Sequence, residues 1–179
     1  MSKVLVIAEH NGQSLNASTA RTLACAAELG AGPADVIVLG AGTGGIATAA
    51  GALAGVARVL VADRPEFAKP LAAVLAPALA ELARGYTHVL APSTTFGKDL
   101  LPRVAALLGV PQVSEIMAVD GPRRFRRPTY AGNAIVTVEV PEGLTVVATV
   151  RNASFKAVGA GGPAPVEPWT PTAAAPTHT

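Results

Sequence analysis

Short apolar runs alternate along the chain, up to Leu108, with longer segments that favour helices. The apolar runs occupy residues 3–9, 35–39, 57–62 and 88–91. The helix-like segments occupy residues 17–29, 46–54, 66–84 and the stretch that ends at Leu108. A short continuous apolar run is typical of a strand buried on both faces, as in a parallel sheet. Since such strands are joined by right-handed helical crossovers, the pattern predicts an α/β fold, a three-layer α/β/α sandwich with a mostly parallel sheet.

The composition is typical of helices packed closely on a sheet, and it argues against a nucleic acid as the binding partner. Hydrophobic residues make up 50% of the chain but aromatic residues only 4%, so the side chains that form nucleic-acid stacking platforms are scarce. The formal net charge is +2, and the two signs are interspersed except in the cluster Arg123–Arg127. A solvated loop is the ordinary explanation of such a cluster, with RNA or membrane binding as the alternative. We therefore expect no nucleic-acid partner.

The sequence shows neither a metal site nor catalytic machinery. His10, His88 and His178 are not at ligand spacing, and the single cysteine, Cys25, lies in a predicted helix. One cysteine forms no disulfide framework, which favours a reducing, cytoplasmic location. Residues 36–57 carry no charge, but their repeated glycines favour a buried strand and helix over a membrane span. We expect no metal, no catalytic residues and no membrane insertion.

The pattern changes in the last third of the chain. Residues 130–140 and 144–150 alternate apolar and polar side chains in β-branched runs joined by a Pro-Glu-Gly turn. This alternation predicts an antiparallel hairpin added to the parallel sheet. From Gly159 the chain becomes Gly, Pro, Ala and Thr with almost no periodic apolar residues. We therefore predict an α/β domain over residues 1–158 and a flexible linker tail over residues 159–179.

Gly40, Gly42 and Gly45 form a G-x-G-x-x-G motif between a predicted strand and a predicted helix, and Asp63 ends the next strand. In dinucleotide-binding domains such a turn holds a pyrophosphate at the helix N-terminus and the acid binds a ribose hydroxyl. The other interpretation is close packing of helix on sheet, in which a side chain at Gly45 would enter the contact. The motif lies in the second βα unit and not the first, which favours packing. A stand-alone nucleotide-binding module that uses these four residues is the alternative function.

Four stretches in order resemble the alpha subunit of electron transfer flavoproteins. They are Val4–His10 with Leu15-Asn16, Val59–Asp63, Thr94–Arg103 and Arg127–Ala134. A fifth stretch, Thr149–Arg151 with Ser154-Phe155, resembles the closing strand of the same domain. The Tyr-Ala-Gly-Asn-Ala and Thr-Thr-Phe-Gly-Lys segments are specific to this family.

The resemblance implies an alpha/beta heterodimer in which FAD performs the redox chemistry. Such a complex takes electrons from flavin dehydrogenases and passes them to a membrane quinone oxidoreductase or another acceptor. The resemblance also implies that FAD is held mainly by a C-terminal domain of the alpha subunit, with help from the beta subunit. We therefore expect this chain to be a structural N-terminal domain that ends before the FAD-binding domain. It would hold no FAD by itself and would be an electron-transfer component without catalytic residues, not an enzyme.

The segment from Arg127 to Phe155 is the candidate for docking the beta subunit. Tyr130, Arg151 and Phe155 are expected there because aromatic and arginine side chains dominate interface energetics. Asn133 is expected there because it can satisfy an exposed main-chain group at a strand edge. The alternative is that Tyr130 and Phe155 complete the core of the domain itself.

Overall fold

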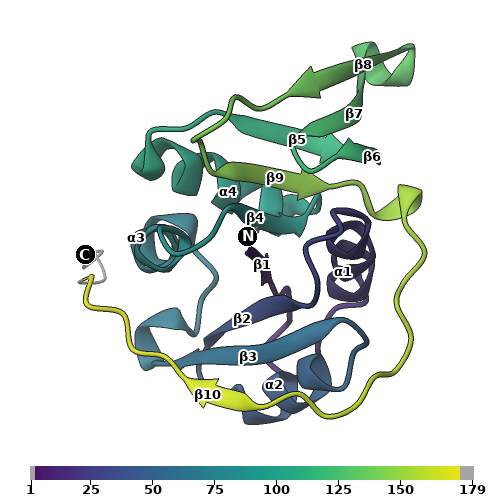
Figure 1. Cartoon of the computed structure of the whole chain (residues 1–179). Coiled ribbons are helices and arrows are strands. Elements are labelled where there is room, and N and C mark those ends of the chain that lie inside the picture. The colour runs from purple at the N-terminus through teal and green to yellow at the C-terminus, as the bar shows by residue number, and fades with distance from the viewer. Residues whose placement is uncertain (1–2, 174–179) are drawn as a thin grey trace.

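A parallel sheet forms the centre of the computed structural model, which describes residues 3–173. Within these residues its seven strands lie in the order β10-β3-β2-β1-β4-β9-β5, and every neighbouring pair is parallel. They are β1 (Val4–Ile7), β2 (Ala34–Gly40), β3 (Val56–Asp63), β4 (His88–Pro92), β5 (Gln112–Ile116), β9 (Val146–Val150) and β10 (Val166–Pro168). Since β2 and β4 lie on opposite sides of β1, the chain reverses its direction across the sheet at this point (Figure 1).

Helices cover both faces of this sheet. They are α1 (Ser18–Glu28), α2 (Gly44–Gly51), α3 (Ala72–Ala83) and α4 (Thr95–Leu108), with short 3-10 turns at Pro65–Phe67, Tyr130–Gly132 and Asn152–Ser154. One buried cluster joins α1 and α2 to the sheet, and another joins α3 and α4 to its opposite face (Figure 1). Alternate strand residues supply the two clusters: Val4 and Val6 enter the first, Leu5 and Ile7 the second. The predicted three-layer sandwich is confirmed.

A three-stranded antiparallel sheet stands beside β5. It consists of β6 (Ala118–Gly121), β7 (Arg124–Thr129) and β8 (Ala134–Glu139), with β7 in the middle. An antiparallel addition to a mostly parallel sheet is therefore confirmed, but its strands differ from the predicted ones, because β8 pairs with β7 and not with residues 144–150.

The prediction that residues 144–150 form a hairpin strand is wrong. β9 is a parallel strand between β4 and β5, and all its side chains are buried. They include Thr149, whose Oγ1 accepts a hydrogen bond from the N–H of Glu115 at 2.9 Å. Thr149 is polar but buried, because its hydroxyl has a partner inside the protein. In the sequence it looks like a solvent-facing residue of an alternating strand. The alternation in the sequence therefore does not mark an exposed face.

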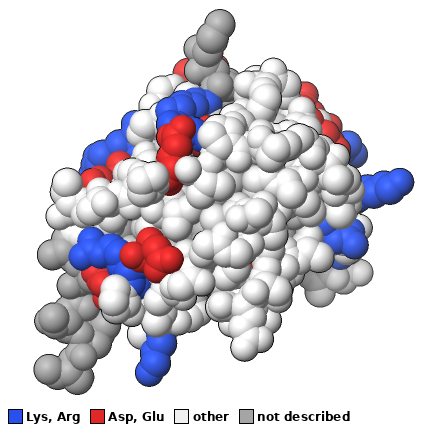
Figure 2. All heavy atoms as spheres, turned by 90° about the horizontal axis from the view of Figure 1, so that it is seen from below, with Lys and Arg blue, Asp and Glu red and all other residues white. Residues whose placement is uncertain are grey.

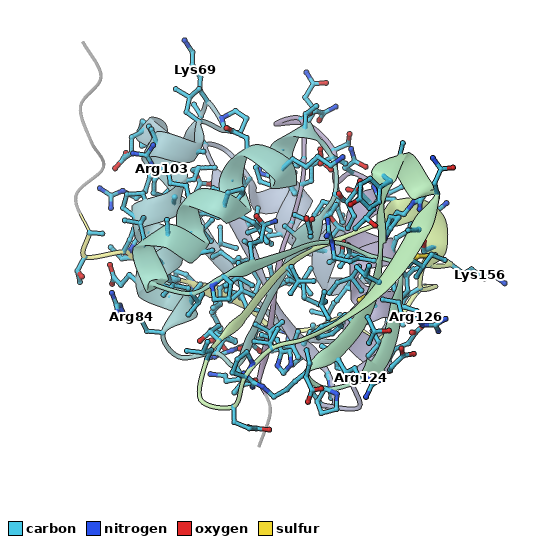
Figure 3. The ribbon with its side chains drawn as sticks, turned by 90° about the horizontal axis from the view of Figure 1, so that it is seen from above. Lys69, Arg84, Arg103, Arg124, Arg126 and Lys156 are labelled. Atoms are coloured by element: carbon cyan, nitrogen blue, oxygen red, sulfur yellow. The ribbon has the colours of Figure 1, made fainter. Side chains whose placement is uncertain are left out.

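Arginines of the cluster Arg123–Arg127 hold the two sheets together, which differs from the solvated loop that the sequence favoured. The Arg123 guanidinium donates to the carbonyls of Val140, Pro141 and Leu144. Arg127 Nε donates to the Ser114 carbonyl of β5 at 2.7 Å. Only Arg124 and Arg126 of this cluster are exposed, and both lie in β7, the middle strand of the antiparallel sheet (Figure 3).

Residues 159–173, which we call the belt, wrap around the domain instead of forming the predicted flexible linker. The N–H of Gly161 donates to Ala52 beyond α2 at 2.7 Å, and β10 extends the sheet beside β3. Glu81 of α3 then accepts hydrogen bonds from the N–H groups of Thr172 and Ala173. Main-chain bonds rather than periodic apolar side chains hold the belt, so its composition does not reveal it. Residues 174–179 of the predicted tail lie outside the described residues.

The face that carries β10 and α2 is mostly uncharged. Figure 2 looks at the molecule from this side, and its Lys, Arg, Asp and Glu side chains gather near the rim. The groups that carry the candidate sites lie elsewhere, at the carboxyl edge of the sheet and in the antiparallel sheet.

Candidate functional site

The first candidate site is the turn between β2 and α2, at the carboxyl edge of the sheet. Asp63, the last residue of β3, accepts hydrogen bonds from the N–H groups of Gly42 at 2.8 Å and Thr43 at 2.9 Å. The hydrogen bonds from Thr43 and then Gly42 hold the pKa of the Asp63 carboxyl below its usual range. The N–H groups that a pyrophosphate would use are therefore already bound to a carboxylate of the same chain.

The glycines of this turn differ in the space around them. A Cβ atom at Gly40 would lie 2.5 Å from Cγ2 of Thr43 and 2.9 Å from Cε1 of His10. Gly42 has a φ of +69°, in the left-handed region that favours glycine. At Gly45, by contrast, no atom lies within 4 Å of such a Cβ, so the expectation that Gly45 lies in a tight contact is wrong. Packing and turn geometry account for Gly40 and Gly42, and neither accounts for Gly45.

The Thr-Thr-Phe-Gly-Lys segment opens α4 at the end of β4. Thr94 Oγ1 accepts a long hydrogen bond, 3.5 Å, from the N–H of Gly97 and caps the helix. A Cβ atom at Gly97 would overlap the carbonyl oxygen of Pro92, so glycine here lets α4 lie directly against the end of β4. The Nζ atom of the next residue, Lys98, lies 2.9 Å from Oε1 of Glu115 in β5. The segment therefore couples two strands of the carboxyl edge.

The four residues expected at a subunit interface have different environments. Tyr130 lies at the tip of the loop between β7 and β8 and is 83% exposed. Asn133 is exposed in the same loop, but its side-chain amide donates to the carbonyl of Tyr130 at 2.9 Å and so stabilises the loop itself. Arg151 is half-buried just after β9. Phe155 is only 5% exposed and belongs to the core, so the expectation that it contacts a partner is wrong.

Arg151 and the loop after β7 line a common hollow at the carboxyl ends of β5 and β9. We call it the Arg151 hollow; its volume is about 260 Å³, and it is lined by Glu115, Pro128, Ala131, Gly132 and Arg151. Hydrogen bonding to Lys98, together with the positive charges of Lys98 and Arg151, holds the pKa of the Glu115 carboxyl below its usual range. The Glu115 carboxyl is therefore ionised at neutral pH.

Sequence reasoning missed Ile135, Val136 and Glu115. Ile135 is 58% exposed and Val136 36% exposed, and both lie in β8 at the outer edge of the antiparallel sheet. Their β-branched character predicts a strand, but nothing local distinguishes an exposed apolar strand from a buried one. Glu115 has a φ of +58° in a bulge of β5, and a glutamate in the sequence gives no signal of such a backbone.

Among residues 3–173, no three His, Cys, Asp or Glu side chains are grouped so as to hold a metal ion. Within the same residues, no helix has the length and apolar character that crossing a membrane requires. Burial raises the pKa of the Cys25 thiol well above its usual range, so this buried side chain is an inert part of the core.

The fold and its edge features define a doubly wound α/β domain with an added antiparallel sheet. The family model described as "Electron transfer flavoprotein domain" matches residues 4–174. The chain therefore belongs to the electron transfer flavoprotein domain family. This membership confirms the resemblance noted in the sequence.

Alpha subunits of electron transfer flavoproteins are similar along nearly the whole chain. The protein from Pseudomonas aeruginosa is 51% identical over 165 residues, which cover 92% of this chain and 53% of that subunit. The protein from Paracoccus denitrificans is 44% identical over 175 residues, covering 96% of this chain and 54% of the subunit. The mitochondrial protein from Dictyostelium discoideum is 40% identical over 173 residues, covering 92% and 48%. The chain spans about half the length of these relatives.

Proposed function

We propose that the chain is the N-terminal α/β domain of an electron transfer flavoprotein alpha subunit and serves as its scaffold and partner-docking domain. The observation that carries the proposal is the family match along residues 4–174 together with coverage of only about half of each alpha subunit. The complete complex would be an alpha/beta heterodimer that holds FAD. It would accept electrons from flavin dehydrogenases and pass them to a quinone oxidoreductase or another acceptor, in the cytoplasm.

The glycine-rich turn after β2 does not support a site for the FAD of such a complex within this chain. FAD carries a pyrophosphate, and the glycine-rich turn after β2 has its Gly42 and Thr43 N–H groups bound to Asp63. The same hydrogen bonds disfavour the alternative of a stand-alone nucleotide-binding module. We therefore assign the binding of FAD to the rest of the complex and assign no redox step to residues of this chain.

The exposed apolar side chains of the antiparallel sheet support a docking role. Tyr130, Ile135 and Val136 are exposed in β8 and the loop before it. Since Ile135 and Val136 point to opposite faces of the strand, the surface that we call the docking face is the exposed edge of β8 together with this loop. β8 is also an edge strand, with β7 on one side and no strand on the other within residues 3–173. Natural proteins seldom leave a β-branched edge strand uncovered, because its free main-chain groups template association. A partner subunit that covers this face would remove that liability.

Titration calorimetry of the chain with its cognate beta subunit tests the docking role. Replacing Tyr130 by Ala removes the most exposed aromatic side chain of the docking face, and we expect binding to weaken by at least tenfold, or about 1.4 kcal/mol. Leu107→Ala is the matched control, because Leu107 is a large exposed apolar side chain on α4 and outside the docking face. Equal affinities of a folded Tyr130→Ala variant and the control would rule out this face.

A further inference from the structure

Residues with unusual backbone φ angles cluster around the Arg151 hollow. Three non-glycine residues among residues 3–173 have left-handed φ angles: Glu115 at 58°, Tyr130 at 49° and Ala131 at 54°. Glu115 and Ala131 line the hollow, and Tyr130 adjoins it. Such residues persist only where the surroundings impose them, and they concentrate at functional sites. Since the Tyr130 side chain is exposed, its own packing does not account for the conformation of this loop.

Hydrogen bonds to neighbouring elements fix Glu115 and the main chain of Arg151 at the base of the hollow. The N–H of Glu115 donates to the buried Thr149 Oγ1 at 2.9 Å, and its carboxylate accepts from Lys98 at 2.9 Å and from Ser93 Oγ at 3.4 Å. The main-chain N–H of Arg151 donates to the carbonyl of Ile116 at 2.9 Å. Contacts from β4, β5, β9 and α4 therefore position the two charged residues before any partner binds.

The charges of the hollow leave one cation in excess. Glu115 already has Lys98 as its partner. The guanidinium of Arg151 has neither an ion pair nor a hydrogen bond with any group in residues 3–173. A half-buried guanidinium with its donors free binds a carboxylate in a bidentate arrangement more strongly than other neutral or charged groups of a protein. Ala131 and Gly132 are small residues in the lining of the hollow, whose volume is about 260 Å³.

We propose that the Arg151 hollow receives the carboxylate of an Asp or Glu side chain of the beta subunit, which pairs with the Arg151 guanidinium. The hollow lies beside Tyr130, so the same partner surface would cover both. Glu115 is a positioning residue in this arrangement, because it fixes the wall of the hollow through Lys98 and does not touch the incoming group. The inference rests on the proposed function and names the chemistry of one contact within it.

Calorimetry with the beta subunit tests the contact with variants that keep the size of the side chain. We expect Arg151→Gln to weaken binding by at least tenfold and Arg151→Lys by less, because lysine keeps the charge but loses the planar fork. Arg124→Gln is the matched control, since Arg124 is an exposed arginine of the neighbouring antiparallel sheet and does not line the hollow (Figure 3). Its effect should stay within twofold. Equal effects of Arg151→Gln and Arg124→Gln would overturn the inference.

A second pair of variants keeps Arg151 in place. Ala131→Glu supplies a carboxylate from within the hollow, whereas Ala131→Gln has the same size without the charge. We expect the Glu variant to bind the beta subunit at least fivefold more weakly than the Gln variant, and equal binding by the two contradicts the inference. These variants decide the question if Arg151→Gln unfolds the chain in thermal melting. A folded wild-type chain that fails to bind the beta subunit at all overturns the proposed function itself, whereas unaffected binding by the variants overturns only this contact.

Discussion

The two halves of the carboxyl edge of the sheet differ in whether their polar groups are hydrogen-bonded within the protein. In the half formed by β1, β2 and β3, Asp63 accepts the N–H groups of the glycine turn, and His10 Nε2 donates to the Leu39 carbonyl at 2.8 Å. In the half formed by β4, β9 and β5, the Arg151 guanidinium has no partner within residues 3–173, and Tyr130 is exposed in a left-handed conformation. The first half is satisfied internally, and the second presents unsatisfied groups outward.

This difference shows that a sequence motif does not by itself identify a binding site. The glycine turn matches a nucleotide-binding pattern in sequence, yet its donors are used inside the protein. The loop after β7 matches no general binding pattern, yet it exposes an aromatic ring next to the hollow that holds the Arg151 guanidinium, which is unpaired within residues 3–173. The pattern specifies a backbone geometry that several uses share, and only the hydrogen-bond partners tell which use applies.

The largest effect that we expect tests the satisfied half. Gly40→Val places two methyl groups where a single Cβ already meets Thr43 and His10, so the free energy of unfolding should fall by about 2–3 kcal/mol. Gly45→Ala is the control in the same motif: its Cβ meets nothing, and removing a helix glycine should stabilise the chain by about 0.5 kcal/mol. Urea unfolding of both variants measures the difference. Equal destabilisation would mean that the two glycines do not differ in packing.

Much of the fold followed from the sequence because helices and buried parallel strands have distinct periods. The strands β1 to β4 and the helices α1 and α2 were predicted with small errors at their ends. The helix predicted over residues 66–84 is instead a 3-10 turn at Pro65–Phe67 followed by α3, which begins only at Ala72. β5, β6, β7 and β10 were not predicted, and β9 was predicted as a strand but with the wrong, antiparallel pairing. β9 carries Thr149, whose buried hydroxyl imitates the polar position of an exposed strand, and β10 is only three residues long and ends in Pro168. Both strands depend on partners far away in the sequence, which no local pattern records.

The candidate site was predictable only in part for a related reason. Tyr130 and Arg151 were identified through the family resemblance and the general preference of interfaces for such residues. Glu115 and Ala131 were not identified, because a left-handed φ is imposed by contacts such as the one between Glu115 and Thr149. Phe155 was assigned to the interface because a sequence does not tell a core aromatic from an exposed one.

An intermediate effect tests how the second half is joined to the antiparallel sheet. His88 of β4 is buried, and its Nε2 donates to the carbonyl of Pro122 in the turn between β6 and β7 at 2.6 Å. Burial, aided by the charge of Arg123, lowers the pKa of His88 below its usual range. The His88 imidazole is therefore protonated more readily in the unfolded chain than in the folded chain. The stability that neutral His88 contributes is complete above about pH 6.5 and is lost as the pH falls below that value toward the pKa of the folded state.

His88→Gln should reveal this dependence. Glutamine keeps a donor for Pro122 but does not titrate, so we expect a loss of about 1 kcal/mol at pH 7.5 and a flatter decline of stability toward pH 5.5 than in the wild type. Urea unfolding at several pH values measures both. The lowered pKa values of Asp63 and Glu115 act at more acidic pH and do not interfere in this window. A wild-type chain whose stability is unchanged between pH 7.5 and 5.5 would show that His88 does not couple the sheets in this way.

The smallest effect tests whether the loop of the second half is strained for a purpose. Ala131 has a φ of 54°, which costs an L-residue more than glycine, whereas glycine gains more freedom in the unfolded chain. We expect Ala131→Gly to raise the free energy of unfolding by only about 0.5 kcal/mol, and Gly132→Ala, at a φ of 92°, to lower it by about 1 kcal/mol. If the loop is held in shape for docking, Ala131→Gly should also weaken beta-subunit binding by about threefold, because a looser loop must be ordered on association. Under this view, unfolding and calorimetric titration of Ala131→Gly show a gain in stability together with a loss of affinity. A gain in both stability and affinity for Ala131→Gly would show that the left-handed loop is a packing compromise and not a prepared docking element.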